Sequence, residues 1–173
     1  MRSKFLQNTS QGFTLIELIL YVGLSAIFLT LVTLFLASLV NGRIKSETIA
    51  EVEQQGFQAM QRITQTIRNA EGVNSPTIGL SATSLSLDVV IVALDPTIFD
   101  STGSALQITE GGGSSVVLTN DLVTVSELIF ENVSRVGAPD IIRVQFTLTR
   151  VNAAGRNEYN YDRTFTTSAG LRL

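Results

Sequence analysis

The sequence predicts an α+β protein, in which one long N-terminal α-helix packs against an antiparallel β-sheet domain and the first half of the helix spans a membrane. Two observations predict this. Residues 13–40 are almost entirely apolar and contain one charged residue, Glu17, whereas the rest of the chain has the mixed composition of a water-soluble protein. After Pro76, runs of β-branched and aromatic residues alternate with turn sequences, which is typical of strands. The predicted segments are residues 1–12, 13–40, 41–71 and 72–173.

The composition excludes several classes of chemistry. The chain has 173 residues and contains no cysteine and no histidine, which excludes disulfides, thiolate nucleophiles, Ser-His-Asp triads and the usual zinc sites. A pI near 4.9 argues against broad affinity for nucleic acids, which requires a basic surface. We see no nucleophile with a base and no pair of carboxylates in an obvious cleft. We therefore expect no enzymatic activity, no cofactor, no metal and no nucleic-acid partner.

The N-terminal segments predict a leader followed by a membrane anchor. Residues 1–12 form a short polar segment, and the largely apolar run of 28 residues that follows exceeds the ~20 that span a bilayer. A cleaved secretory signal has a shorter apolar core, so we expect this run to be retained as an anchor. Basic residues on the two sides balance each other, so the positive-inside rule does not orient the anchor. They are Arg2 and Lys4 before it and Arg43 and Lys45 after it.

The stretch QGFTLIELILYVGLSAI resembles the N-terminal signature of type IV pilins and of the pseudopilins of type II secretion systems. In that family a short basic leader ends in glycine, the next residue is usually phenylalanine, and a glutamate follows four positions later in an apolar helix. Gly12, Phe13 and Glu17 match these three requirements. The resemblance covers residues 1–40 and is only architectural beyond them, where it implies a pilin-like fold.

The resemblance implies a role for each of the three residues. Prepilin peptidase would cleave between Gly12 and Phe13 from the cytoplasmic side and N-methylate the new amino group of Phe13. Glu17 would serve assembly and methylation, and in a filament it would face the Phe13 amine of a neighbouring subunit. The attraction within such a pair is strong in a low-dielectric core, although the cost of desolvating both charges offsets much of it. The pair therefore serves mainly to set the register between subunits, because a subunit docked one step wrong would leave a buried carboxylate unpaired.

The resemblance also implies a function. We expect a structural subunit, a minor pilin or pseudopilin, of a type IV pilus or a type II secretion filament. It would lie as a single-pass protein in the bacterial inner membrane, with its C-terminal domain outside the cytoplasm, before it enters the filament. Its expected partners are prepilin peptidase, other pilin or pseudopilin subunits, the inner-membrane assembly platform and, before assembly, the lipid bilayer.

Two alternatives remain open at this point. A subunit of a DNA-uptake pilus would need a basic surface stripe, and the arginines of residues 135–172 are its only source. A stand-alone, membrane-anchored envelope binding domain would make the match at Gly12, Phe13 and Glu17 fortuitous.

Beyond Val40 the apolar residues follow a helical period. They recur at steps of three and four and predict the buried face of an amphipathic helix. The members of this stripe are Ile49, Val52, Gly56, Met60, Ile63, Ile67 and Ala70. Gly72 and Pro76 make a plausible stop, so we expect one helix over residues 13–71.

The remainder predicts one antiparallel sheet folded over the second half of this helix. Expected strands are residues 85–93, 105–109, 115–119, 126–133, 140–151 and 157–167. In residues 140–151, apolar residues at even positions alternate with polar residues, which predicts a strand with one buried face and one solvent-exposed face. We interpret Gly111–Gly113 as a hairpin turn rather than a phosphate loop, since no helix start or lysine follows.

Other features allow two interpretations each. Tyr159 and Tyr161 share one face of a predicted strand, either packed on the helix or forming an adhesive patch. Asp95, Asp100 and Asp121 could offer oxygen ligands to calcium, but their spacing matches no compact calcium loop. An acidic middle (residues 71–131) precedes a basic end (residues 135–172), and these either neutralise each other within the fold or pair head to tail between subunits.

Overall fold

The structure, a computed structural model, describes residues 12–172 and divides the chain into two compact units, Met1–Gly42 and Arg43–Leu173. The expected leader, apart from Gly12, lies outside the described residues. Helix α1 (Leu15–Arg68) runs without a break for 54 residues. This confirms the single helix predicted over residues 13–71. The helix begins two residues later and ends three residues earlier than predicted.

Helix α1 ends earlier than its apolar stripe predicts because the chain enters a sheet. Strand β1 (Ala70–Ser75) pairs antiparallel with β3 (Leu85–Val89), and Ala70 lies opposite Val89. The last stripe residue, Ala70, is therefore buried as the first residue of a strand. Its sequence, AEGVNS, has little strand propensity, so the pairing partner overrides the local preference.

The globular unit contains two antiparallel sheets, so the prediction of a single sheet was wrong. The first has the order β1-β3-β4-β5-β6 and the second the order β2-β7-β8-β9. The remaining strands of the first sheet are β4 (Thr97–Thr102), β5 (Ala105–Glu110) and β6 (Val116–Val117). The second sheet consists of β2 (Ser81–Ala82), β7 (Val123–Asn132), β8 (Ile141–Arg150) and β9 (Asp162–Gly170). Pairing of β2 with β7 draws residues 81–82 out of the first sheet.

Several predicted strands have different ends in the structure. The expected strand over residues 85–93 stops at Val89, and the 3₁₀ helix η1 (Val92–Leu94) follows. The expected strand over 157–167 begins only at Asp162, because residues Asn157–Tyr159 form the 3₁₀ helix η2. Strands β1, β2 and β4 were not predicted. Pro76 follows β1 and Pro96 precedes β4, and β2 is only two residues long, so the sequence pattern gave none of them a clear strand signal.

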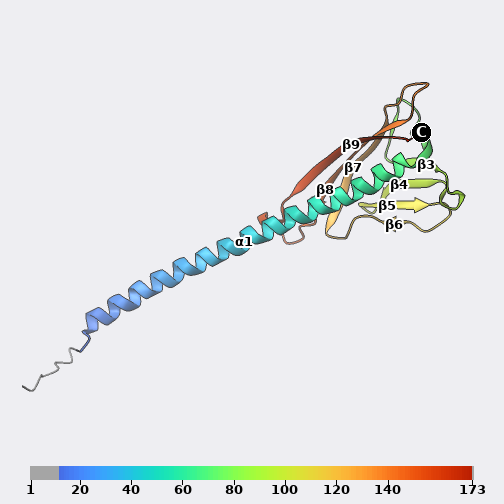
Figure 1. Cartoon of the computed structure of the whole chain (residues 1–173). Coiled ribbons are helices and arrows are strands. Elements are labelled where there is room, and N and C mark those ends of the chain that lie inside the picture. The colour runs from blue at the N-terminus through green and yellow to red at the C-terminus, as the bar shows by residue number, and fades with distance from the viewer. Residues whose placement is uncertain (1–11, 173) are drawn as a thin grey trace, which may run out of the picture. The chain divides into compact units, whose positions relative to one another are not determined.

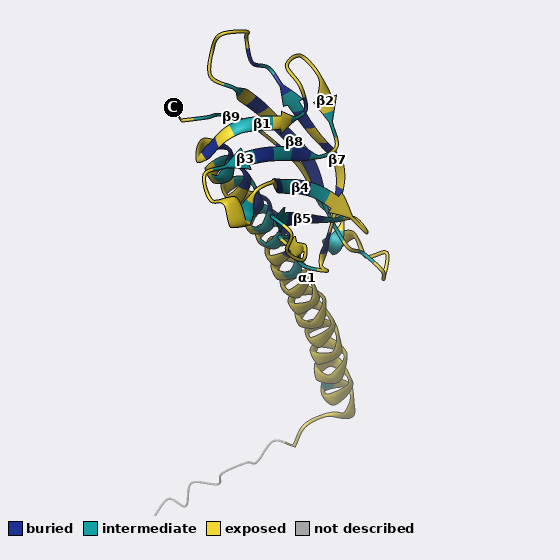
Figure 2. Ribbon diagram, turned by 90° about the vertical axis from the view of Figure 1, so that its right-hand side faces the viewer, coloured by how far each residue is buried: buried dark blue, intermediate teal, exposed yellow. Residues whose placement is uncertain are grey.

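The core lies between the C-terminal part of α1 and the inner faces of both sheets. In Figure 1 this part of the helix, cyan to green, lies along the strands, and Figure 2 shows in dark blue where the buried residues fall along the ribbon. The predicted stripe is confirmed for Val52, Ile63 and Ile67, which are fully buried, whereas Met60 is only partly buried. The largest fully buried strand residues in this core are Phe99, Phe130 and Phe146.

Strand β8 confirms the alternation that its sequence predicts. Ile142, Val144, Phe146 and Leu148 are fully buried. The exception on the outer face is Thr147, which is also buried. Its hydroxyl donates to the Glu127 carboxylate at 3.0 Å and lies 2.8 Å from the Thr164 hydroxyl. A register shift between β7 and β8 brings Glu127 over this position.

The helix and strand β9 approach each other closely at Gly56. A Cβ atom at Gly56 would lie 2.1 Å from the ring of Phe165. That ring stacks on Phe146 at 5.5 Å between centroids and meets Phe57 edge-on at 5.7 Å. Only glycine leaves room for the aromatic ring between helix and strand here.

The turn after β5 confirms the hairpin interpretation of the three glycines. Gly111 has a φ of 57°, and its N–H donates to the carbonyls of Leu94 and Pro96 at 3.0 Å each. A Cβ there would lie 2.2 Å from the Ala93 carbonyl oxygen. The chain then returns as β6, which pairs antiparallel with β5.

Candidate functional site

The residues singled out by the sequence lie at the start of helix α1, and Thr14 organises this start. The Thr14 hydroxyl accepts a hydrogen bond from the Glu17 N–H at 3.3 Å, and its carbonyl accepts one from the Leu18 N–H at 3.1 Å. This is the arrangement of a helix N-cap. Sequence reasoning missed the role of Thr14, although Thr-x-x-Glu before an apolar run is the signature of a capping box.

Tyr21 is the second residue that sequence reasoning missed. Its hydroxyl donates to Glu17 Oε1 at 3.2 Å, and its ring meets the Phe13 ring edge-on with centroids 6.1 Å apart. Glu17 is half-buried beside these two aromatic rings. Positions i and i+4 of a helix are neighbours, so the spacing of Glu17 and Tyr21 was the available signal.

The site is open at the bond between Gly12 and Phe13. Both residues are exposed, and among the described residues 12–172 nothing beyond its chain neighbours lies within 4 Å of a Cβ built on Gly12. Glu17 lies in the first turn, where the positive end of the helix dipole favours a carboxylate. A carboxylate accepts about four hydrogen bonds, and Tyr21 supplies one, so Glu17 can accept further donors. Within residues 12–172, no basic side chain forms an ion pair with Glu17.

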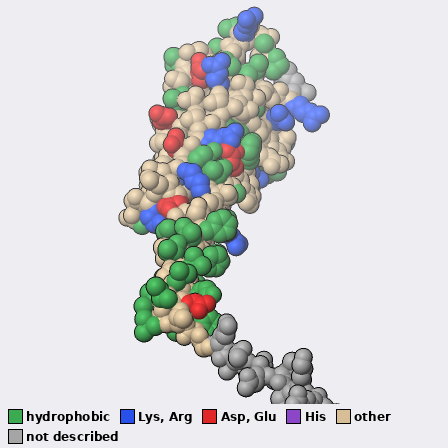
Figure 3. Space-filling model, turned by 90° about the vertical axis from the view of Figure 1, so that its left-hand side faces the viewer, with side chains coloured by type: hydrophobic (Ala, Val, Ile, Leu, Met, Phe, Trp, Pro, Cys, Tyr) green, Lys and Arg blue, Asp and Glu red, His purple; other side chains and the backbone are tan. Residues whose placement is uncertain are grey.

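The rest of residues 13–40 presents an apolar surface. Every large hydrophobic side chain of this segment is exposed, and Figure 3 shows the hydrophobic side chains covering it. The hydroxyls of Thr30 and Thr33 donate to the carbonyls of Ala26 and Leu29 at 2.8 and 2.9 Å, so they need no water. By length and composition, α1 is the one helix within residues 12–172 that could cross a membrane.

In the globular unit, a polar cluster joins strand β9 to the helix. Arg163 forms an ion pair with Glu53, and the Tyr161 hydroxyl donates to Glu53 Oε1 at 2.9 Å. The hydrogen bond from Arg163 lowers the pKa of Glu53, and the hydrogen bond to Glu53 raises the pKa of Arg163. Burial and then the Glu53 carboxylate raise the pKa of Tyr161.

The two tyrosines of the C-terminal segment do not share a strand face. Tyr161 packs on the helix through Glu53, as the first interpretation expects. Tyr159 belongs to the 3₁₀ helix η2 instead, and its ring lies 5.9 Å from the Arg150 guanidinium and 5.7 Å from that of Arg156. The prediction of a shared face was wrong because the strand begins after both residues.

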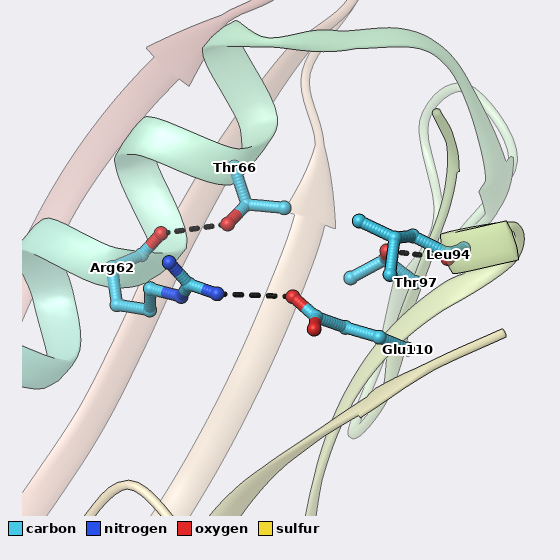
Figure 4. A network of polar contacts seen from close by, with 5 residues as sticks. All are labelled: Arg62, Thr66, Leu94, Thr97 and Glu110. Carbon is cyan, nitrogen blue, oxygen red and sulfur yellow. Dashed lines mark hydrogen bonds and ion pairs between the residues drawn. The ribbon is translucent and has the colours of Figure 1, made fainter. Parts of the chain in front are cut away.

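A hollow of about 440 Å³ lies between α1 and the loop that follows β3. Arg62 Nη2 spans it to Glu110 Oε1 at 3.0 Å (Figure 4). The hydroxyls beside this pair are already bonded: Thr66 donates to the Arg62 carbonyl and Thr97 to the Leu94 carbonyl. The charges of Arg62 and Glu110 are thus paired with each other, and both hydroxyls are already hydrogen-bonded. The expected absence of enzymatic activity stays a prediction.

Within residues 12–172, one ion pair joins the acidic middle to the basic end. Arg143 of β8 lies 2.8 Å from Glu131 of β7. Arg156 pairs locally with Glu158 at 3.4 Å, and its hydrogen bond adds to that of the backbone in lowering the pKa of Glu158. Carboxylates therefore interrupt the arginines that a DNA-binding stripe would need. Residues 12–172 contain no group of three His, Cys, Asp or Glu side chains that could hold a metal ion, so the structure does not gather Asp95, Asp100 and Asp121 into such a group. That the chain binds no metal stays a prediction.

The comparisons with known proteins add no relative. No protein-family model, no curated protein and no solved structure matches the chain.

Proposed function

We propose that this chain is a structural subunit, a minor pilin or pseudopilin, of a type IV pilus or a type II secretion filament. One observation carries the proposal: Gly12, Phe13 and Glu17 stand at fixed spacing at the head of a helix whose apolar side chains are exposed over residues 13–40. In the proposal, prepilin peptidase cleaves after Gly12 and methylates Phe13. The subunit then passes from the inner membrane into the filament, with its C-terminal domain outside the cytoplasm.

The exposed apolar surface suits both states of such a subunit. A bilayer covers it before assembly, since 28 residues exceed the ~20 needed to cross hydrocarbon. Other helices cover it afterwards, with small residues such as Gly23 and Ala26 allowing close approach. In both states the surroundings of the segment are apolar, which explains why it contains only one charged residue.

Glu17 then sets the position of each subunit. The methylated amine of Phe13 lies at the positive end of its own helix, where a cation is unfavourable, so it gains most from a carboxylate on a neighbour. A buried charge without a partner costs several kcal/mol, so a subunit docked one step away would lose the pair and become unstable in the filament. Tyr21 keeps the Glu17 carboxylate oriented through its hydroxyl.

Mass spectrometry of the mature N-terminus tests the processing step. Full-length protein is taken from the membranes of cells with an active prepilin peptidase. We expect a chain that starts at N-methylated Phe13. A Gly12→Val variant, expected to retain Met1 while inserting normally, serves as the matched control. Wild-type protein that retains Met1 in such cells contradicts the proposal.

Substitution of Glu17 tests the assembly step. Glu17→Ala is expected to insert into the membrane normally and to be absent from sheared filaments. Glu47→Ala is the control, because Glu47 is an exposed carboxylate of the same helix that pairs with Arg43 at 3.0 Å. Tyr21→Phe keeps the carboxylate but removes its donor, so its incorporation should be reduced rather than lost. Normal incorporation of Glu17→Ala would instead favour a stand-alone envelope binding domain.

A further inference from the structure

We propose that the outer edge of strand β9, with the groove beside it, binds an extended, carboxylate-bearing segment of a partner polypeptide, which adds a strand to the second sheet. The inference concerns the globular unit alone. It goes beyond the proposed filament role, and either proposal can fail without the other.

Strand β9 differs from the other three sheet edges. Edges β2 and β6 are two residues long, and edge β1 is broken by two register shifts. Strand β9 has nine residues, and its register with β8 is continuous from Asp162 to Gly170. Natural sheets protect their edges with short strands, bulges, prolines, charges or a covering helix or loop. After Arg163, β9 reads TFTTSAG, without a bulge, a proline or a charge, and a groove separates this part of the strand from α1.

The hydrogen-bonding groups on this edge have a defined direction. The Tyr161 carbonyl accepts from Arg150 N–H at 2.9 Å, and Leu171 N–H donates to the Asp140 carbonyl at 2.9 Å, so odd-numbered residues point toward β8. Backbone groups of alternate residues in a strand point to opposite sides. Thr164, Thr166 and Ser168 therefore point their N–H and C=O groups outward. Within residues 12–172 no strand lies on that side, and Figure 1 shows β9, dark red, as the outermost strand.

A groove lies next to this edge and is shaped for the side chains of an added strand. Its volume is about 640 Å³, and α1 forms one wall and residues 163–167 of β9 the other. Phe57, 59% exposed, and the partly buried Met60 give the helix wall apolar surface. A strand added to β9 would place every second side chain over this wall, as in other proteins that bind peptides by strand addition.

The charge of the groove determines the kind of segment it fits. Its lining contains Arg68 and Arg163 and no acidic residue. Arg163 already pairs with Glu53, whereas Arg68 forms no ion pair within residues 12–172. Arg172 lies beside it, since its N–H donates to the Arg68 carbonyl at 3.2 Å. A carboxylate on the added strand would meet Arg68, and a cationic segment would be repelled.

Two capped peptides test the proposal against the full-length chain in detergent micelles. The acidic probe is Thr-Val-Thr-Val-Thr-Glu-Thr, and the basic probe has lysine in place of the glutamate. Amide hydrogen exchange is measured with each probe. We expect saturable binding of the acidic probe and new protection at Thr164, Thr166 and Ser168. The basic probe should bind at least about fivefold more weakly, in line with the loss of an exposed ion pair and the addition of a like charge.

Two variants separate the backbone and charge contributions. Thr166→Pro removes an outward N–H but no bond to β8, a position where edge strands tolerate proline, and should weaken binding of the acidic probe at least about tenfold. Thr166→Val keeps the N–H and is the matched control, expected to bind as the wild type does. Arg68→Glu should reverse the preference between the two probes.

Four results would overturn the proposal. They are absence of binding by the acidic probe, equal binding of both probes, protection outside β9, and a concentration-dependent dimer that protects the same amides, which would make a second copy the occupant. Should Thr166→Pro not fold, the protection pattern of the wild type and the Arg68→Glu result still decide.

Discussion

Replacing Gly56 with alanine is expected to destabilise the globular unit, although this change stabilises most helices. A Cβ at Gly56 would lie 2.1, 2.2 and 2.6 Å from three ring carbons of Phe165. Carbon atoms make favourable contacts at about 3.5 Å, so the ring and the helix must separate by roughly 1.4 Å. Phe146 and Phe57 hold the ring at centroid distances of 5.5 and 5.7 Å, so it cannot turn aside without losing these contacts.

The two opposing contributions give the magnitude. Alanine in the interior of a helix is more favourable than glycine by about 1 kcal/mol of helix propensity. Forcing extra carbon into a packed core costs about 1–3 kcal/mol, and complete expulsion of Phe165 would cost about as much as Phe→Ala, roughly 3–5 kcal/mol. We expect a net loss of about 2 kcal/mol in the free energy of unfolding, and a fall in Tm of roughly 6–10 °C for a unit of this size.

Thermal and urea unfolding of the full-length chain in micelles, followed by circular dichroism, measures this loss. Gly42→Ala is the matched control, because a Cβ at Gly42 has nothing within 4 Å and should not lower stability. The double variant Gly56→Ala, Phe165→Leu should be less destabilised than the sum of its single changes, since the two residues are in contact. A Gly56→Ala chain as stable as the wild type, or more stable, would refute the reasoning.

Three further predictions concern the same unit. Ile63→Ala, at a fully buried position, should cost about 2–5 kcal/mol of unfolding free energy, whereas Gln58→Ala on the exposed face should change it by less than about 0.5 kcal/mol; urea unfolding compares the two. The lowered pKa of Glu53 means that its pairing with Arg163 stabilises the fold above the ordinary glutamate pKa of 4.5, and that this stabilisation is lost as pH falls through the lower pKa of the folded state. The stability difference between wild type and Glu53→Gln should therefore shrink on acidification below that value, and a constant difference would contradict this. Asn132 is 2% exposed and its side chain donates to the Pro76 carbonyl at 2.9 Å, so Asn132→Ala should cost about 1–3 kcal/mol of unfolding free energy in the same urea experiment. An Asn132→Ala chain as stable as the wild type would refute this prediction.

Local sequence determined the elements whose pattern is set by residues a few positions apart. Helix α1 follows from an uninterrupted apolar run and then a stripe at steps of three and four, without a proline before Pro76. The buried face of β8 follows from strict alternation. Thr14, Glu17 and Tyr21 meet because positions three and four apart share a helix face, so the candidate site could have been predicted more fully than it was.

Only the tertiary structure decided what depends on partners distant in sequence. Whether residues 70–75 continue a helix or begin a strand depends on the presence of β3, and the division into two sheets depends on β2 pairing with β7. Gly56 meets Phe165, and Glu53 meets Arg163, across more than a hundred residues of chain. The open edge of β9 likewise depends on which strand the chain places last in the sheet. A pairing partner contributes more free energy than a local propensity of a few tenths of a kcal/mol, and that partner is not contained in the segment itself.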